Sequence, residues 1–358
     1  MGELKQGRGL GDWLNERVRL SSLVDFLRQK EVPRQKHSFW YIFGGLAFFF
    51  FSIQVLTGVL LVIYYSPRPD SAYESVRFIG SQVPFGWLIR SLHGWSANLL
   101  IGVVLIHFFS VFFLKAYRRP REMMWFSGVL LLFLMLGFAF TGFLLPWDTK
   151  AYFATKIGTE IPRTIPLIGD WMVSILRGGE YIAEESLKRL FALHVVILPL
   201  LTSALILFHL ILNQVHASSI PLRIEARQPG IPFYPNYLFR DAISWLVGLT
   251  LLLSLALLWP LQLGLKADPF ASAPVGIRPE WYFLTLFETL RLVPAQILGV
   301  ASEVWVNLAV MVVTGGIFLV PILDRKASRQ QASPIFTAIG VAACLYMVTA
   351  IALAYLTT

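Results

Sequence analysis

Residues 91–115, SLHGWSANLLIGVVLIHFFSVFFLK, decide the fold of this chain. The run is longer than the roughly 20 apolar residues that a helix needs to cross a membrane, so it predicts a spanning helix. It carries two histidines, His93 and His107, which stand 14 residues apart. This spacing is close to four helical turns, so both side chains lie near one helix face, about 21 Å apart along the axis.

A second apolar run, FALHVVILPLLTSALILFHLILNQV, starts at residue 191 and carries His194 and His209, 15 residues apart. If the two helices run in the same direction, His93 faces His194 near one membrane surface, and His107 faces His209 near the other. An imidazole inside lipid is costly and usually functional, although a lone histidine is more often a packing residue with a hydrogen-bond partner. Haem iron takes two axial imidazoles, and helix bundles hold cofactors between facing helices. The four histidines are therefore candidate iron ligands of two non-covalent b-type haems that transfer electrons.

The composition indicates a membrane protein. Of the 358 residues 56% are hydrophobic and 14% are charged, and the mean hydropathy is +0.65, whereas soluble domains carry nearer a quarter charged residues. The net charge of +9 could suggest nucleic acid. The basic residues lie in short loops between apolar runs, however, so we expect membrane lipid and no nucleic acid. The single cysteine, Cys344, excludes disulfides within the chain and multi-cysteine zinc or iron–sulfur sites.

We expect an all-α, polytopic transmembrane protein, with a four-helix haem-binding bundle followed by three further transmembrane helices. The apolar runs lie at about residues 39–65, 91–115, 125–147, 191–215, 237–259, 303–323 and 334–356.

A connection rich in Pro and Gly divides the chain into a four-helix di-haem domain (38–220) and a three-helix domain (221–358) that carries the second long loop. The first domain is preceded by an amphipathic segment (1–37), in which apolar residues alternate with charges between Leu10 and Lys30. This segment is expected to lie on the membrane surface, or alternatively to pack on a partner. The two long loops, 148–190 and 260–302, are expected to be functional or to carry helices of their own.

Positive charge sets the expected orientation. The N-terminal segment and the loops on its side of the membrane hold 18 Lys and Arg residues, and the longer loops opposite hold 12. Short positive loops mark the cytoplasmic, or n, side. We therefore expect a protein integral to a bacterial-type inner (cytoplasmic) membrane, with its N-terminus on the n side and its C-terminus on the opposite, p side.

Glycines repeat the spacing of the histidines. Two pairs, each 14 residues apart, lie in the first and third apolar runs: Gly44 with Gly58, and Gly128 with Gly142. Glycine lets a flat macrocycle approach the backbone, which predicts haem contact, although membrane glycines often serve helix packing instead. Arg90, three residues before His93, is placed to pair with a haem propionate or, alternatively, to anchor the helix at the interface.

Several motifs surround these residues: QVLTG (54–58), WLIRSLH (87–93), GFLLPWD (142–148), ALHVVILPLLT (192–202), PEWY (279–282) and RLVP (291–294). With them the chain resembles the cytochrome b family of quinol:cytochrome c reductases and their photosynthetic counterparts, from about Val32 onward. The resemblance implies a Q cycle, in which quinol is oxidised on the p side and quinone is reduced on the n side. It also implies a Rieske-type iron–sulfur protein and a c-type cytochrome subunit as partners in a homodimeric complex.

Features of two branches of this family are combined. The 15-residue histidine spacing, the ADPFASAP run and the seven helices resemble the photosynthetic branch, whereas His216 and IPFYPNYLFRD resemble the quinone-reducing site of the respiratory branch. The photosynthetic branch attaches a third haem through a cysteine at the position of Ile42, so no covalent third haem is expected here. Ser110 stands where both branches often have an arginine near the n-side haem.

Quinol oxidation on the p side requires a proton acceptor beside an apolar slot. Glu280 is the candidate acceptor and Tyr282 a candidate hydrogen-bond donor, and both are candidate catalytic residues. The slot is expected to be lined by Phe143, Pro146, Trp147, Tyr152, Ile157, Pro279 and Trp281. Alternatively, Glu280 only pairs with a loop cation such as Lys266 or Arg278.

On the n side, His216 and Asp241 are candidate proton donors to a quinone, and Arg240 is a candidate partner of Asp241 or of the propionates. Simple solvation of these polar residues is the alternative. Two other kinds of protein remain open. A di-haem membrane anchor would pass electrons without needing the PEWY loop, and a transporter would have no use for two stacked histidine pairs.

Overall fold

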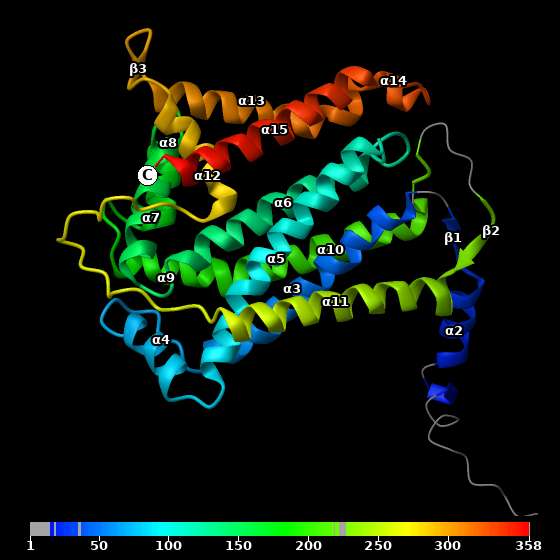
Figure 1. Cartoon of the computed structure of the whole chain (residues 1–358), viewed down its shortest axis with the longest axis horizontal. Helices are drawn as coiled ribbons and strands as arrows, with labels where there is room; N and C mark the ends of the chain where they lie inside the picture. Colours follow the sequence, from blue (N-terminus) through cyan, green and yellow to red (C-terminus); the bar gives the residue numbers. More distant parts are fainter. Residues whose placement is uncertain (1–14, 18, 35–36, 218, 222–226, 358) are drawn as a thin grey trace, which may run out of the picture.

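Seven long helices run side by side in this computed structural model, and short helices gather at one end of them (Figure 1). The structure describes residues 15–17, 19–34, 37–217, 219–221 and 227–357. The expected all-α transmembrane architecture is confirmed.

The spanning helices are α3 (Ile42–Val62), α5 (Gly86–Phe113), α6 (Glu122–Phe143), α10 (Leu198–His216), α11 (Leu238–Leu258), α13 (Ser302–Leu323) and α15 (Pro334–Leu356). The span of α10 begins with α9 (Glu184–Ala192) and a π-helical turn, η2 (Leu193–Ile197). Helix α5 and the span that starts with α9 begin several residues before the apolar runs predicted from the sequence.

Helices α3, α5, α6 and α10 form the predicted four-helix bundle, in which α3 packs on α5 and α6 packs on α10. One hydrophobic cluster joins these helices and includes Phe50, Leu100 and Met135. Leu252 of α11 packs in the same cluster. Helix α11 lies against α3 and α5, α13 lies against α6, and α15 lies against α5. The outer faces of the spans remain apolar and exposed, for example at Leu200 on α10, which requires lipid or other subunits around them.

Both long loops carry helices, as expected. They lie at the end of the bundle that we call the α7 end (Figure 1). The helices there are α4 (Ala72–Ser81), α7 (Thr149–Arg163), α8 (Gly169–Arg177), η4 (Trp281–Phe283) and α12 (Leu284–Leu292), next to a small β3–β4 hairpin (Gln296–Ile297, Val300–Ala301). Helix α7 starts where the Asp148 carboxylate accepts a hydrogen bond from the Ala151 N–H (2.8 Å), a typical N-cap.

The opposite end is the α2 end. Helix α2 (Leu20–Gln29) runs across it, and β1 (Glu31–Arg34) pairs antiparallel with β2 (Arg227–Pro232) (Figure 1). Helix α2 lies within the segment 1–37, whose place on the membrane surface stays a prediction and whose residues 1–14, 18 and 35–36 lie outside the described residues. Helix α11 is preceded directly by η3 (Phe233–Tyr237), which packs on α2. The C-terminal end of α15 lies at the α7 end (Figure 1).

A buried hydrogen bond at the α2 end ties the four-helix bundle to the last three spans. The Tyr117 hydroxyl donates to Asp324 Oδ2 (2.7 Å), and both side chains are buried. The other oxygen of Asp324 accepts from the Ala327 N–H (3.2 Å) and starts the short helix α14 (Arg325–Ser328). Close by, the Trp125 indole donates to the carbonyl of Ile317 on α13 (2.8 Å).

We expect Tyr117→Phe to destabilise the folded protein by about 1.5–3 kcal/mol, because a buried carboxylate loses a hydrogen bond. Thermal unfolding in detergent measures this loss. Tyr181→Phe is the matched control, since that side chain is 74% exposed. Equal melting temperatures for the two variants would show that the Tyr117 bond contributes nothing.

Candidate functional site

The structure brings the four predicted histidines together in two pairs. The ring centres of His93 and His194 are 6.3 Å apart, and His107 of α5 lies near His209 of α10. When two imidazoles bind one metal atom through bonds of about 2 Å, their ring centres lie about 6 Å apart, since each ring adds the distance from its nitrogen to its centre. The first pair therefore fits one metal atom held between two helices.

Three of the four histidines have their Nδ1 atom within hydrogen-bond distance of a hydroxyl. The pairs are His93 with Thr57 (2.9 Å), His209 with Ser127 (2.8 Å) and His194 with Thr141 (3.2 Å). Each hydroxyl also lies within hydrogen-bond distance of a main-chain carbonyl of its own helix and donates to it. The hydroxyl oxygen is then the acceptor for Nδ1–H, so Nε2 is the nitrogen left for a metal.

The three residues that carry these hydroxyls were not among the candidate site residues identified from the sequence. Each stands one residue before one of the predicted glycines, in the dipeptides Thr57-Gly58, Ser127-Gly128 and Thr141-Gly142. The repeat of Ser or Thr before Gly is a signal that could have revealed them. The fourth dipeptide is Phe43-Gly44, and correspondingly Nδ1 of His107 has no hydrogen-bond partner among the described residues.

The glycines make room for the histidine rings. An added Cβ would lie 3.2 Å from His107 at Gly44, 3.4 Å from His93 at Gly58, 3.4 Å from His209 at Gly128 and 2.5 Å from His194 at Gly142. A Cβ at Gly142 would force the ring of His194 to shift, and one at Gly44 would be tighter than most real Cβ contacts, whereas at Gly58 and Gly128 it would just touch the ring at van der Waals distance. This is a physical reason for glycine besides the predicted contact with the macrocycle, which stays a prediction.

The π-helical turn η2 explains how pairs with different sequence spacings stay level. An α-helix turns by about 100° per residue, so one additional residue would rotate His209 by that angle relative to His194. The turn absorbs this residue through a hydrogen bond from the Leu198 N–H to the Leu193 carbonyl, five residues back. Pro199 follows directly and cannot donate to the carbonyl four residues before it, which favours such a bulge.

The donor set fits haem. Within the described part of the chain no three His, Cys, Asp or Glu side chains gather as a metal cluster, so each site offers two ligands only. Arg90 donates to the carbonyls of Leu261 (2.7 Å) and Gln262 (3.0 Å), which ties α5 to the second long loop. Its contact with a propionate stays a prediction. Ser110 is buried and donates to the His107 carbonyl (2.8 Å).

At the α7 end, Glu280 forms an ion pair with Lys150 (2.8 Å). The carboxylate is partly exposed, and the same ammonium lies 5.5 Å from the ring centre of Phe143. The loop cations expected as alternative partners, Lys266 and Arg278, contact other residues. Lys266 pairs with Glu74 (3.5 Å), and Arg278 lies over the ring of Tyr355. The pairing with Lys150 brings the end of α6, the start of α7 and the PEWY segment together.

The aromatic residues of PEWY are held firmly. The Trp281 indole donates to Asn98 Oδ1 on α5 (2.9 Å), and the Tyr282 ring packs on Phe283 at 4.9 Å. Burial, and secondarily the negative charge of Glu280, raise the pKa of the Tyr282 phenol. Tyr282 therefore stays protonated and can donate a hydrogen bond, as predicted for this residue type.

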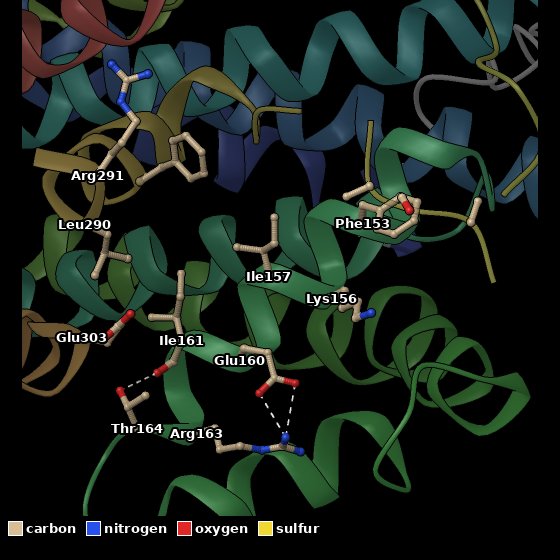
Figure 2. A pocket seen from close by; sticks show the side chains of 14 residues that line it. Phe153, Lys156, Ile157, Glu160, Ile161, Arg163, Thr164, Leu290, Arg291 and Glu303 are labelled. Atoms are coloured by element: carbon tan, nitrogen blue, oxygen red, sulfur yellow. Dashed lines mark hydrogen bonds and ion pairs between the residues drawn. The ribbon is translucent and has the colours of Figure 1, made fainter. Parts of the chain in front are cut away.

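The predicted slot residues do not all line one space. Ile157 lines a cleft of about 700 Å³ between α7 and α12 (Figure 2). Pro279, Glu280 and Trp281 border a separate cleft of about 420 Å³ with Lys150. Trp147 and Tyr152 are buried in the hydrophobic core of the α7 end, with their ring centres 5.6 Å apart, and their place in an apolar quinol slot stays a prediction. Pro146 is half-buried beside them.

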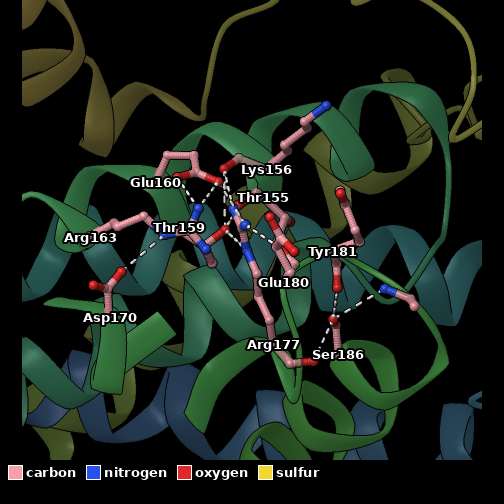
Figure 3. A network of polar contacts seen from close by, with 11 residues as sticks. Thr155, Lys156, Thr159, Glu160, Arg163, Asp170, Arg177, Glu180, Tyr181 and Ser186 are labelled. Carbon is pink, nitrogen blue, oxygen red and sulfur yellow. Dashed lines mark hydrogen bonds and ion pairs between the residues drawn. The ribbon is translucent and has the colours of Figure 1, made fainter. Parts of the chain in front are cut away.

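A polar network fixes the wall of the larger cleft (Figure 3). The guanidinium of Arg177 on α8 is buried and contacts Glu160 (2.7 Å), the Thr159 hydroxyl (2.7 Å) and the Lys156 carbonyl (2.9 Å). Arg163 also pairs with Glu160 (3.0 Å). Since α7 is anchored to α8 in this way, its cleft-facing side chains are held in place.

At the α2 end, the predicted residues lie on different helices. Asp241, in the first turn of α11, approaches Gly45 of α3, where a Cβ would meet its carboxylate at 3.3 Å. Its Oδ1 atom is buried without a hydrogen-bond partner among the described residues. His216 ends α10, and its carbonyl accepts from Arg121 (2.7 Å). Within the described ranges His216 and Asp241 have different neighbours, and Arg240 is exposed.

Comparisons with known proteins agree with this geometry. The family model described as cytochrome b/b6/petB matches residues 28–217, and the one described as cytochrome b (C-terminal)/b6/petD matches residues 266–358. The cytochrome b subunit of a cytochrome bc complex from Chlorobaculum thiosulfatiphilum is 47% identical, over 92% of this chain and 77% of its own. Cytochrome b6 of Auxenochlorella protothecoides is 39% identical, over 59% of this chain and 98% of its own.

Among solved structures, a chain of a hyperthermophilic respiratory Complex III superposes with a TM-score of 0.86 at 28% sequence identity. The match covers 97% of this chain and 91% of that one.

We expect Gly142→Ala to displace His194 and to remove or perturb the haem nearest the α7 end, because its Cβ would lie 2.5 Å from the ring. Haem content and reduced-minus-oxidised spectra measure the loss. Gly137→Ala on the same helix is the control, since its Cβ would meet Leu198 at an ordinary 3.9 Å. Unchanged spectra in Gly142→Ala would contradict the assignment of His194 as a ligand.

Proposed function

The chain belongs to the cytochrome b/b6 family, which it matches in both halves, and from this premise we propose that it oxidises quinol on the p side of a membrane and reduces quinone on the n side. It is an integral membrane electron-transfer protein of a bc-type complex. The quinol:acceptor activity, the Q cycle and its contribution to the proton gradient are part of the proposal.

The observation that carries the proposal is the two histidine pairs, one toward each end of the bundle. His93 with His194, and His107 with His209, would each hold one b-type haem. The bound haems supply one-electron carriers that connect the two membrane sides. Thr57, Ser127 and Thr141 hold the imidazole protons on Nδ1, and the four glycines leave space for the rings.

We assign the α7 end to the p side. There Lys150 pairs with the carboxylate form of Glu280, which is the form that can accept a proton from a quinol hydroxyl. The protonated Tyr282 phenol donates a hydrogen bond, and the Asn98–Trp281 contact keeps the PEWY segment against α5. One electron of each quinol leaves to a Rieske-type iron–sulfur protein, so this partner, a c-type cytochrome and a second copy of the complex belong to the proposal.

We assign the α2 end to the n side, in agreement with the excess of positive charge on that side. Reduction of quinone requires proton donors there. Asp241 supplies a carboxyl with an oxygen that no described residue engages, and His216 supplies an imidazole. Ile42 opens α3 without a thiol, and Cys344 lies on α15, so both haems of the proposal are non-covalent.

We expect Glu280→Gln to slow quinol oxidation by about 10- to 100-fold, because the amide cannot take the proton. Both haem spectra should remain intact, since Glu280 is not a ligand. Steady-state quinol oxidation by the purified complex measures the rate. Glu74→Gln, another ion-paired acid at the same end, is the control. An unchanged rate would favour a di-haem anchor over a quinol oxidase site.

His216→Ala combined with Asp241→Ala should block reoxidation of the n-side haem by quinone, because both proposed proton donors are lost. Stopped-flow spectroscopy of the pre-reduced complex follows the reaction. Asp25→Ala is the control, since this exposed carboxyl lies on α2 at the same end. Normal reoxidation in the double variant would argue against quinone reduction at this place.

A further inference from the structure

One of the four histidines differs from the others in the surroundings of its Nδ1 nitrogen. Nδ1 of His107 is buried and has no hydrogen-bond partner among the described residues. At the other three histidines, a hydroxyl of a neighbouring helix lies 2.8–3.2 Å from Nδ1. A buried polar atom without a partner is destabilising and rare in folded proteins, so this difference between the histidines calls for an explanation.

The difference comes from the residue before the glycine. A Cβ at Gly44 would lie 3.2 Å from Cε1 of His107, and a Cβ at Gly58 would lie 3.4 Å from Cε1 of His93. Both rings therefore turn the same atom toward α3. The residue before Gly58 carries a hydroxyl, whereas the residue before Gly44 is Phe43, whose phenyl ring has no oxygen to accept a hydrogen bond.

The main chain does not replace the missing hydroxyl. At His194 a carbonyl assists, since that of Phe138, four residues before the glycine, lies 3.1 Å from Nδ1. The corresponding carbonyl on α3 belongs to Trp40, in the tighter 3-10 turn η1 (Ser38–Tyr41) that opens this span. In the described structure, Nδ1 of His107 is thus left without either kind of acceptor.

A hydrogen bond at Nδ1 affects a metal on the other side of the ring. An acceptor for the Nδ1 proton makes Nε2 a more basic ligand. A more basic ligand stabilises ferric iron more than ferrous iron, so the reduction potential falls. At the α7 end, His93 and His194 would both be strengthened in this way. At the α2 end, only His209 would be strengthened, because His107 lacks an acceptor.

We propose that Phe43 acts through His107 to raise the reduction potential of the α2-end haem above the value that a hydroxyl at this position would give. The reaction concerned is the transfer of one electron from the α7-end haem to the α2-end haem. The first is oxidised, the second is reduced, and no bond forms or breaks. A higher potential of the acceptor makes this transfer more favourable. The inference rests on the two haem sites of the proposed function.

Phe43→Thr and Phe43→Val in the assembled complex test the proposal. The two new side chains have nearly the same shape, but only threonine brings a hydroxyl that can accept from His107. Redox titration of the b-haem absorbance of the purified complex measures both midpoint potentials. We expect the α2-end haem to have a lower potential in the threonine variant than in the valine variant. The potential of the α7-end haem should be the same in both.

The reciprocal change is Thr57→Val, which removes the hydroxyl that faces His93. It should raise the potential of the α7-end haem alone, and it thereby also identifies which of the two titration waves belongs to that haem. Thr250→Val is the matched control. The Thr250 hydroxyl likewise donates to a carbonyl four residues back in a spanning helix (2.8 Å), but it is exposed on α11. Both potentials should stay unchanged in this variant.

Equal potentials of the α2-end haem in the two Phe43 variants would overturn the proposal, because another group would then already serve Nδ1 of His107. Should the Phe43 variants fail to assemble, Thr57→Val and Ser127→Ala decide. Raised potentials in these two variants support the proposal, and unchanged potentials refute it. An unsubstituted complex with fewer than two b-type haems would refute the proposed function itself. Two haems whose potentials do not respond to these substitutions would refute this inference alone.

Discussion

An imidazole in the middle of a membrane has to have both of its nitrogens satisfied, and most of the bundle can be understood from this constraint. Water is absent at that depth, so the protein itself must supply a hydrogen-bond partner for Nδ1 and leave Nε2 to a metal. Thr57, Ser127 and Thr141 meet the first requirement for three rings. The residue after each hydroxyl is a glycine, which leaves space for the ring. Helices α3 and α6 are thus shaped by the histidines of α5 and α10.

Ion pairs between charged side chains organise the surface at the α7 end. Two ionic contacts, Lys150 with Glu280 and Arg177 with Glu160, join different loop segments to one another, and a third, Arg291 with Glu288, lies within α12. They differ in exposure, from an open pair at Lys150 to a carboxylate enclosed completely at Glu288. Buried ion pairs contribute little net stability. Their contribution is therefore mainly positional, because they hold the residues around the two clefts in place.

Most of the fold could be predicted from the sequence, because hydropathy and the spacing of four histidines are one-dimensional signals. The side-chain partners could not be predicted equally well. Glu280 was expected to have Lys266 or Arg278 as its alternative partner, yet Lys150 holds it, since only the folded loops bring residues 130 positions apart together. Trp147 and Tyr152 were expected to line an apolar slot for quinol. The structure buries them, because the same apolar rings form the core under the loop helices.

The π-helical turn at Leu193–Ile197 shows that the number of residues between two histidines does not by itself fix how they are placed along and around a helix. Two histidines can face each other across the bundle only if they lie at the same level, and a helix can keep them level while the number of residues between them varies. At a π-helical turn next to a proline, one residue can be inserted or deleted while the helical turns on both sides keep their orientation relative to each other. Chains with unequal histidine spacings can therefore share one arrangement of cofactors. An alignment that forbids gaps inside transmembrane helices would misplace every residue on one side of this turn.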